Sequence, residues 1–497
     1  MRRRQKEQHG AKSASSLRFG CEFGGFCAGS WRNEQEREGP PGLHSYCRDS
    51  RILSCCPETR TQQEANGITV FGHLHKLAVA NLRIALLGDA TGFNNRGVAR
   101  LDRGHIDEAI TDFTEAIRRD PQLAKAFGNR AIAWIAKREW NRVIQDSNVA
   151  IRLDPTDFGS YHSRGVALFE DGELDLAIQD FSDAIQRNPK NAASYHNRAT
   201  AFCLQGEFAK AVDDATEAIR LNGRLVDAYL TRCEGLIGLR RLDEALVDAK
   251  RLLELAPKAS SSHLSYGKVL ELLGQSNEAL MHIDRAIEMD GTSSTAYMVR
   301  GRIWLQLGEY AKGVEDCNRA IELEPNCLEA YANRGLARHY LTDYQQAMND
   351  HQQAIALRPD AAVPFNNRGY TNQALGRFAD AKADYEHAIE LAPDHPNAHK
   401  NLAWLMATCP EDKHRDGTLA VEHARRAMEL SNWMQHQWLP ILAAAYAEAG
   451  DFDAAIEWQS RWIEKLGERA DSEQQQRLQD YRAHRPFRER SMPGDAA

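Results

Sequence analysis

Helix-terminating residues recur at a stride of 34 positions through most of this chain. Proline ends a helix because it lacks a backbone N–H, and glycine ends one because it tolerates left-handed backbone. Nine evenly spaced stops predict nine copies of one structural unit rather than a set of globular domains. The prolines are Pro121, Pro155, Pro189, Pro257, Pro325, Pro359 and Pro393, and Gly223 and Gly291 fill the two remaining places.

Each unit is predicted to be a pair of helices joined by a short turn. In the first unit, apolar and small residues return at helical spacing on both sides of Gly104, which breaks the pattern. The same break recurs at Gly172, Gly206, Gly274, Gly308 and Gly376. The predicted units are 90–123, 124–157, 158–191, 192–225, 226–259, 260–293, 294–327, 328–361 and 362–395.

Small residues mark the places where neighbouring helices must approach closely. A helix pair of this length cannot bury its apolar face alone, so the units are expected to stack on one another. A large side chain at a close-approach site would overpack the contact and cost roughly 1–3 kcal/mol. In the first helices the small residues are Gly97, Ala131, Gly165, Ala199, Cys233, Gly267, Gly301, Gly335 and Gly369.

The segment YANRGLARHYLTDYQQAMNDHQQAIALRP (331–359) resembles the tetratricopeptide repeat family, in the form of a bacterial-type multi-repeat array. Similar blocks cover residues 90 to about 467. The resemblance implies an all-α fold, a right-handed α-solenoid of about eleven helix-turn-helix units with a C-terminal capping helix. It also implies that the first helix of each pair lines the concave face.

Four regions are expected along the chain. They are a disordered N-terminal segment (1–66), a lead-in helix (67–89), the solenoid (90–467), and a capping helix with a basic tail (468–497). The unit at 397–430 carries about five extra residues around Pro410 to Gly417, in the turn between its helices. The final helix is predicted over residues 471–483, with Asp471 or Ser472 as N-cap.

The net charge and the cysteines indicate which partners and which cellular compartment are expected. The net charge of −8 is a poor match for nucleic acid, and no segment has the apolar length of a membrane span. Five cysteines are scattered through the repeats, which favours free thiols in a reducing, cytoplasmic compartment. A zinc site at Cys21, Cys27, Cys47 and Cys55 is a weak alternative, because their spacing does not follow the usual pattern.

No arrangement of residues predicts catalysis, a cofactor or a metal centre. The chain has no phosphate-binding loop, no H-E-x-x-H and no G-x-S-x-G. His162 and His196 occupy equivalent places in neighbouring units, where they could hold a metal or sense pH. The simpler interpretation of both is a solvated surface histidine.

A recurrent asparagine is the best candidate for a binding function. Asparagine is a mediocre helix former, so its return in the first helices needs a reason. Its amide is both donor and acceptor, so a series of them can pair with the backbone of an extended peptide of any sequence. The residues are Asn95, Asn129, Asn197, Asn333, Asn367 and Asn401.

This series resembles the one that lines the groove in O-GlcNAc transferase repeats, but it is interrupted in the middle. Ser163, Thr231, Ser265 and Val299 stand at the intervening places. The asparagines could instead form local hydrogen bonds between adjacent helices, or reflect inherited repeat consensus. The adjacent arginine series is expected to be structural, with its guanidinium groups meeting acids of a neighbouring helix. It comprises Arg96, Arg130, Arg164, Arg198, Arg232, Arg300, Arg334 and Arg368.

These features predict a non-enzymatic scaffold that binds extended protein segments in the concave groove. The partners are expected to be proteins or peptides, with no nucleic acid and no membrane. An alternative is a regulatory or substrate-presenting subunit of a separate enzyme such as a glycosyltransferase. A structural spacer without a peptide ligand is the third possibility. The sequence does not predict the oligomeric state.

Overall fold

The computed structural model describes residues 79–81, 84 and 88–489, and within them all regular structure is helical. Eleven helical hairpins follow one another and a final helix, α25 (Ser472–Arg482), closes the series. This confirms the predicted all-α solenoid with its C-terminal capping helix. The hairpins are α3 (Ala90–Leu101) with α4 (Ile106–Arg119), α5 (Ala124–Ala136) with α6 (Trp140–Leu153), α7 (Phe158–Glu170) with α8 (Leu174–Arg187), α9 (Ala192–Leu204) with α10 (Phe208–Leu221), α11 (Val226–Gly238) with α12 (Leu242–Leu255), α13 (Ser260–Leu272) with α14 (Ser276–Met289), α15 (Ser294–Gln306) with α16 (Tyr310–Leu323), α17 (Leu328–Tyr340) with α18 (Tyr344–Leu357), α19 (Ala362–Ala374) with α20 (Phe378–Leu391), α21 (Pro396–Thr408) with α22 (Gly417–Leu430), and α23 (Leu439–Glu448) with α24 (Phe452–Leu466).

The N-terminal predictions lie mostly outside the described residues. This applies to the whole segment 1–66, including the possible zinc ligands. Of the predicted lead-in helix, residues 79–81 and 84 are helical, and Ala80 is buried.

In the nine regular units, the second helix ends at a residue with φ between −136° and −146°, just before the periodic proline or glycine. The C-cap Asp154 has φ −139°, which suits a residue preceding proline. Asn222 precedes Gly223 with nearly the same φ, −140°. Neither Gly223 nor Gly291 is among the residues with positive φ. The expectation that these two glycines end helices through left-handed backbone is therefore wrong, since they adopt the geometry of the proline units.

Left-handed backbone occurs instead in the turn between the two helices of a unit. The turn glycines have φ between +72° and +85°, and a Cβ on any of them would meet nothing within 4 Å. Conformation, not space, therefore requires glycine there. Arg138, Arg240 and Thr342 take the same place with φ of 57°, 60° and 64°. The glycines are Gly104, Gly172, Gly206, Gly274, Gly308, Gly376 and Gly450.

Small residues of the first helices are in tight contact with the second helix of the same unit. A Cβ added to Gly97 would lie 2.6 Å from Phe113, and one on Gly369 would lie 2.8 Å from Tyr385. Real Cβ atoms do not approach so closely, so these glycines are sterically required. Gly165, Gly267, Gly301 and Gly335 are equally constrained. The expectation that these small residues serve the stacking of neighbouring units is therefore wrong, since the close approach lies between the two helices of one hairpin.

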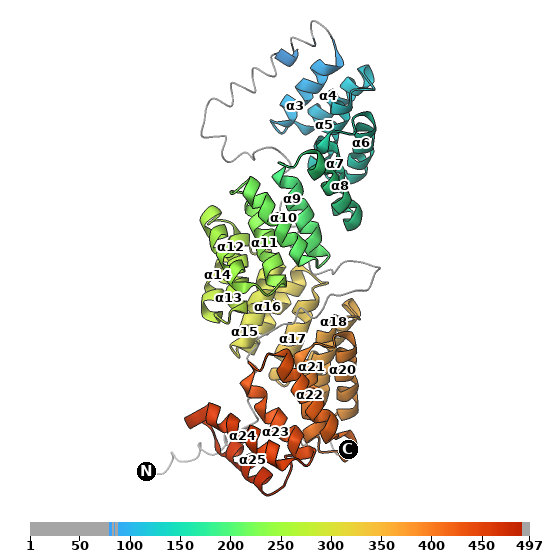
Figure 1. Ribbon diagram of the computed structural model, residues 1–497. Coiled ribbons are helices and arrows are strands. Elements are labelled where there is room, and N and C mark those ends of the chain that lie inside the picture. The colour runs from blue at the N-terminus through green and yellow to red at the C-terminus, as the bar shows by residue number, and fades with distance from the viewer. Residues whose placement is uncertain (1–78, 82–83, 85–87, 490–497) are drawn as a thin grey trace, which may run out of the picture.

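The first helices form the inner layer of the array. Each first helix contacts the next first helix along the chain, as α3 contacts α5 and α19 contacts α21. The second helices pack mainly on the first helices of their own unit and the following unit. The side formed by the first helices is therefore the shorter, concave side. Figure 1 shows the elongated stack that results, from α3 to α25.

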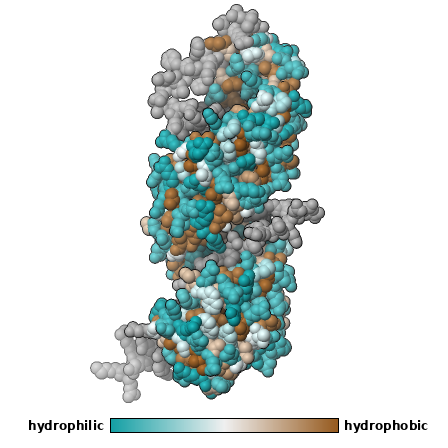
Figure 2. Space-filling model, viewed as in Figure 1, coloured by the Kyte–Doolittle hydropathy of each residue, from teal (hydrophilic) through white to brown (hydrophobic). Residues whose placement is uncertain are grey.

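The surface in the same view is mostly hydrophilic, with small scattered hydrophobic patches (Figure 2). This is the surface expected of an array whose apolar faces are buried between units.

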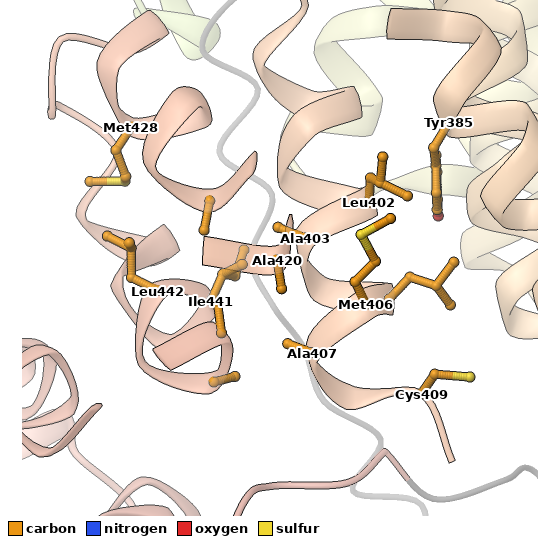
Figure 3. Packing of buried hydrophobic residues seen from close by; sticks show 14 of the residues in the cluster. Tyr385, Leu402, Ala403, Met406, Ala407, Cys409, Ala420, Met428, Ile441 and Leu442 are labelled. Atoms are coloured by element: carbon orange, nitrogen blue, oxygen red, sulfur yellow. The ribbon is translucent and has the colours of Figure 1, made fainter. Parts of the chain in front are cut away.

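The C-terminal hairpins share the largest apolar core. Tyr385 of α20, Leu402 and Met406 of α21, and Met428 of α22 meet Leu442 of α23 in this cluster (Figure 3). The additional turn residues before α22 include a short 3-10 helix, η2 (Asp412–His414).

The predicted final helix is confirmed as α25. Asp471 caps it, and Gln474 completes a capping box. Its two apolar residues, Leu478 and Tyr481, are buried, and Tyr481 packs against Ala443, Ala447 and Ala455 of the preceding hairpin. Its remaining polar residues give the array the hydrophilic end that a terminal unit requires.

Candidate peptide-binding face

The six asparagines of the predicted groove occupy the same place on six first helices. We call the side of the first helices that carries these positions the asparagine face. Asn95 is exposed and Asn129 is half-buried, whereas the other four are buried. Asn95 lies on α3, Asn129 on α5, Asn197 on α9, Asn333 on α17, Asn367 on α19 and Asn401 on α21.

Two of the six amides donate hydrogen bonds to the preceding first helix. Asn129 Nδ2 donates to Asn94 Oδ1 at 2.9 Å, and Asn401 Nδ2 donates to Asn366 Oδ1 at 2.9 Å. Asn366 Nδ2 in turn donates to Asn367 Oδ1 at 3.2 Å. Local bonding between helices, the alternative raised by the sequence, therefore accounts for part of the series. Each of these donors uses one of its two N–H groups in the bond described.

Asn333 is different from these two. Its side chain is 2% exposed, and its Nδ2 has no hydrogen-bond partner among the described residues. Leaving a buried amide donor unsatisfied costs about 1–3 kcal/mol. Such groups are rare in folded proteins.

Two buried histidines stand one residue before positions of this series, His162 before Ser163 and His196 before Asn197. His162 Nδ1 lies 2.9 Å from Ser194 Oγ, and His196 Nδ1 lies 3.4 Å from Thr231 Oγ1. Burial lowers the pKa of each imidazole from 6.5 to about 4, because the charged form loses its hydration. The interpretation of His162 and His196 as solvated is wrong, since they are 6% and 4% exposed.

A charged stretch follows in the middle of the same face. Lys268 Nζ lies 2.8 Å from Glu234 Oε1, joining α13 to α11. Glu271 of α13 is buried and accepts hydrogen bonds from Arg302 and Gln306 of α15. Lys268 and Arg302 stand three residues after Ser265 and Val299, which places them on the asparagine face. Sequence reasoning missed this network, although Glu234, Lys268 and Arg302 recur at the stride of the repeat.

The arginine beside each asparagine position has the structural role that was predicted. Arg232, for example, forms two hydrogen bonds with the carboxylate of Asp248, at 2.7 and 2.6 Å, between the two helices of one unit. Its third nitrogen reaches Thr216 of the preceding unit at 3.2 Å. Hydrogen bonding to Asp248 raises the pKa of the Arg232 guanidinium. The guanidinium therefore joins three helices.

All eight arginines pair with an aspartate sixteen residues later. Sequence reasoning missed the aspartates, although their fixed distance from the arginines is visible in the sequence. They are Asp112, Asp146, Asp180, Asp214, Asp248, Asp316, Asp350 and Asp384.

The C-terminal end of the asparagine face is occupied by part of the chain itself. After α25 the chain returns to α21, where Glu489 accepts hydrogen bonds from Gln373 Nε2 at 3.1 Å and from Trp404 Nε1 at 3.4 Å. The Glu489 N–H donates to the Thr408 carbonyl at 2.9 Å. The basic tail predicted from sequence is thus half-buried on the array over residues 486–489.

Metal-binding and membrane-spanning features are absent from the described part of the chain. It contains no group of three or more His, Cys, Asp or Glu side chains placed to hold a metal ion. None of its helices combines the length and apolar character needed to cross a bilayer. The cysteines at 203, 233, 317, 327 and 409 are free and buried, as predicted.

Stacked helical hairpins with an inner layer of first helices define a helical repeat protein. Models of the tetratricopeptide repeat match residues 94–157, 162–224, 273–326, 328–361 and 362–395. The chain belongs to the tetratricopeptide repeat family. A search of curated proteins found no match.

The fold is also found in solved structures. The Cut9–Hcn1 hetero-tetramer of the APC/C is 14% identical, with 89% of this chain and 92% of that chain covered and a TM-score of 0.56. A tetratricopeptide repeat protein from Parabacteroides merdae is 18% identical, over 50% of this chain and 98% of that one, with a TM-score of 0.43. Yeast Tom70 is 17% identical, over 80% of this chain and 95% of that one, with a TM-score of 0.38.

Proposed function

We propose that this protein is a non-catalytic scaffold that binds extended protein segments on the asparagine face of its concave groove. The observation that carries the proposal is the buried Nδ2 of Asn333, in a series of amides along one face, which has no acceptor among the residues that the structure describes. The carbonyl groups of an extended peptide backbone would supply such acceptors at regular intervals. Asn197, Asn367 and Asn401 would contribute further contacts along the same line.

Binding of this kind gains from the rigidity of the array. Each backbone contact contributes modestly, because it replaces a hydrogen bond to water. A surface that is already ordered avoids the entropy cost of arranging the receptor, so several modest contacts add to a useful affinity. The arginine–aspartate pairs, such as that of Arg232, which joins three helices, supply that order.

A second candidate function uses the same groove. The asparagine series resembles that of O-GlcNAc transferase repeats, so the chain could act as a regulatory or substrate-presenting subunit of a separate enzyme such as a glycosyltransferase. On this hypothesis, adding the chain to its enzyme would raise the turnover of protein substrates and leave the turnover of short peptides unchanged.

The compartment and partners follow from the same features. The free, buried thiols favour the cytoplasm, where such thiols stay reduced. The net charge of −8 favours protein partners over nucleic acid.

A peptide selection tests the groove. A library of displayed random peptides is selected on the immobilised full chain, and the affinities of the enriched peptides are then measured. A chain with Asn333→Ala, Asn367→Ala and Asn401→Ala is expected to bind at least about tenfold more weakly, the effect of one or two lost hydrogen bonds. A small fall in melting temperature accompanies the change, because Asn401 and Asn367 also bond to Asn366.

The matched control removes three asparagines from the other layer of the array. Asn141, Asn277 and Asn349 are exposed on the second helices α6, α14 and α18. Their replacement by alanine should leave peptide affinity unchanged. If no peptide is enriched, or if both triple variants bind equally well, the groove function is rejected and the spacer interpretation is favoured.

A further inference from the structure

The last described residues of the chain lie on the array with alternating side-chain directions. Phe487 packs against Trp404 with ring centroids 5.8 Å apart, and Glu489 accepts from the same indole at Nε1. Arg488, between them, instead forms an ion pair with Glu448 at 2.6 Å. Alternation with a period of two is the property of an extended segment, so the tail is bound as a peptide ligand would be.

The hydrogen-bond donors around the Glu489 carboxylate belong to the helices of the array and not to the tail. Tyr385, which is 0% exposed, donates its hydroxyl hydrogen to Gln373 Oε1 at 3.0 Å. This bond fixes the amide orientation, so that Nε2 points to the Glu489 carboxylate. Trp404 Nε1 adds a second neutral donor. Two donors converging on one carboxylate favour an acidic side chain at this place.

The neighbouring positions are equally selective. Arg477, itself 3% exposed, lies over the Phe487 ring with its Cζ 4.0 Å from the centroid. An aromatic side chain is favoured there, because it is held between an indole and a guanidinium. Glu448 pairs with Arg488, and the Thr408 carbonyl accepts the backbone N–H of Glu489. The site therefore specifies an aromatic, a basic and an acidic residue in succession.

This site continues the asparagine face. Trp404 and Thr408 stand three and seven residues after Asn401, so both lie on the asparagine face of α21. Gln373 stands seven residues after Asn366, whose side chain accepts the hydrogen bond from Asn401. A segment that follows the asparagines toward the C-terminal hairpins would therefore reach the place that Glu489 occupies. The tail and a long groove ligand cannot both lie there.

We propose that Gln373, Trp404, Glu448 and Arg477 form a specificity subsite for an extended partner segment with the pattern aromatic–basic–acidic, and that Phe487–Arg488–Glu489 occupies it until the partner displaces them. The inference rests on the proposed groove function and names the chemistry of the partner at one end. It also implies that binding is weakened by competition with a covalently tethered sequence, whose effective concentration is high.

The test uses a fluorescent peptide with the sequence of residues 484–489, HRPFRE, and the full chain. Substituting the tail with Phe487→Ala and Glu489→Ala vacates the subsite. Fluorescence anisotropy should then show at least about tenfold tighter peptide binding than in the unsubstituted chain, since tethered competition is removed. Equal binding by the two chains would reject the proposal.

Specificity is tested in the tail-substituted chain. Gln373→Glu places a carboxylate against the peptide's glutamate and should abolish binding, and a peptide ending in Gln should recover it. Gln353→Glu, on the exposed surface of α18, is the matched control and should change nothing. Peptides with Ala for Phe, or with Gln for Glu, test the same contacts without altering the protein, and undiminished binding of both would reject the proposal.

Two further outcomes separate the possibilities. If the unsubstituted chain is a dimer that dissociates on tail substitution, the occupant is the tail of a second copy, and the partner assignment is wrong. If peptides selected on the chain bind through the asparagines while HRPFRE does not bind, the proposed specificity subsite is rejected and the groove function is retained. If neither the selected peptides nor HRPFRE binds, both the subsite and the groove function are rejected.

Discussion

At the scale of single residues, the size of one side chain in each hairpin is matched to that of another sixteen residues later. Where the first helix has glycine, the facing residue is larger, as in Gly97 with Phe113 and Gly369 with Tyr385, and the smallest such partner is Cys317 opposite Gly301. Where the first helix has alanine or cysteine, the equivalent later residue is small. These pairs are Ala131 with Ser147, Ala199 with Ala215, and Cys233 with Ala249, all 0% exposed. The volume of the pair, rather than of either residue, is constrained.

Replacing Gly335 with leucine should therefore destabilise the array strongly. A Cβ at residue 335 would already lie 2.5 Å from His351 Cε1, so a larger side chain forces α17 and α18 apart. The expected loss is roughly 1–3 kcal/mol or more in the free energy of unfolding, measured by urea denaturation. Gly159→Ala is the control, because its Cβ would meet only Asp157 at 3.5 Å. Equal midpoints for the two variants would contradict close packing at residue 335.

At the scale of helices, the arginine–aspartate pair fixes how the two helices of a unit and the preceding unit meet. The unit at 260–293 shows that the two positions depend on each other. Tyr266 stands there in place of arginine and His282 in place of aspartate, with ring centroids 4.6 Å apart. An aromatic contact has replaced the ion pair at both ends, which avoids leaving an unpaired buried charge.

Removing one aspartate tests this role. Asp248→Ala leaves the half-buried Arg232 without its charged partner, and we expect a loss of about 2 kcal/mol in the free energy of unfolding. Hydrogen exchange should accelerate first in α11 and α12, because stability in a stacked array is local. Glu217→Ala, which removes an exposed pair with Arg220, should leave exchange unchanged. Uniform acceleration along the whole chain would argue against a local clamp.

The helices and their stacking could be predicted from the sequence because each unit repeats the same local signals. The left-handed turns at Gly104 and the cap at Asp471 depend on neighbouring residues alone. The groove was harder to predict, since Asn129 and Asn401 bond to residues 35 positions earlier on another helix. The return of Glu489 to Trp404 spans 85 positions, follows no repeat, and left no signal in the sequence.

At the scale of the whole molecule, several histidines are buried as neutral groups between helices. Burial lowers the pKa of His162, His196 and His339 from 6.5 to about 4, and that of His351 to about 3. His162, His339 and His351 lie next to hydroxyl groups, at Ser194 and Thr371, rather than next to carboxylates. Protonation of these imidazoles in the folded array is therefore unfavourable, and it lowers the free energy of unfolding.

Acid should destabilise the array in a defined window. Because the folded pKa lies below the unfolded value of 6.5, the unfolded chain binds protons first as the pH falls. Stability is full above pH 6.5 and falls toward pH 4, with each such histidine contributing up to about 1.4 kcal/mol per pH unit. Urea midpoints at pH 7.5 and pH 5.0 measure the difference. The chain with His162→Asn and His196→Asn, which carries the residue type found at the equivalent Asn94 and Asn366, should show a smaller difference. The control His105→Asn, at an exposed position, should show the same difference between pH 7.5 and pH 5.0 as the unsubstituted chain. If the unsubstituted chain, the double variant and this control all show the same difference, these buried imidazoles are not the cause of the acid response.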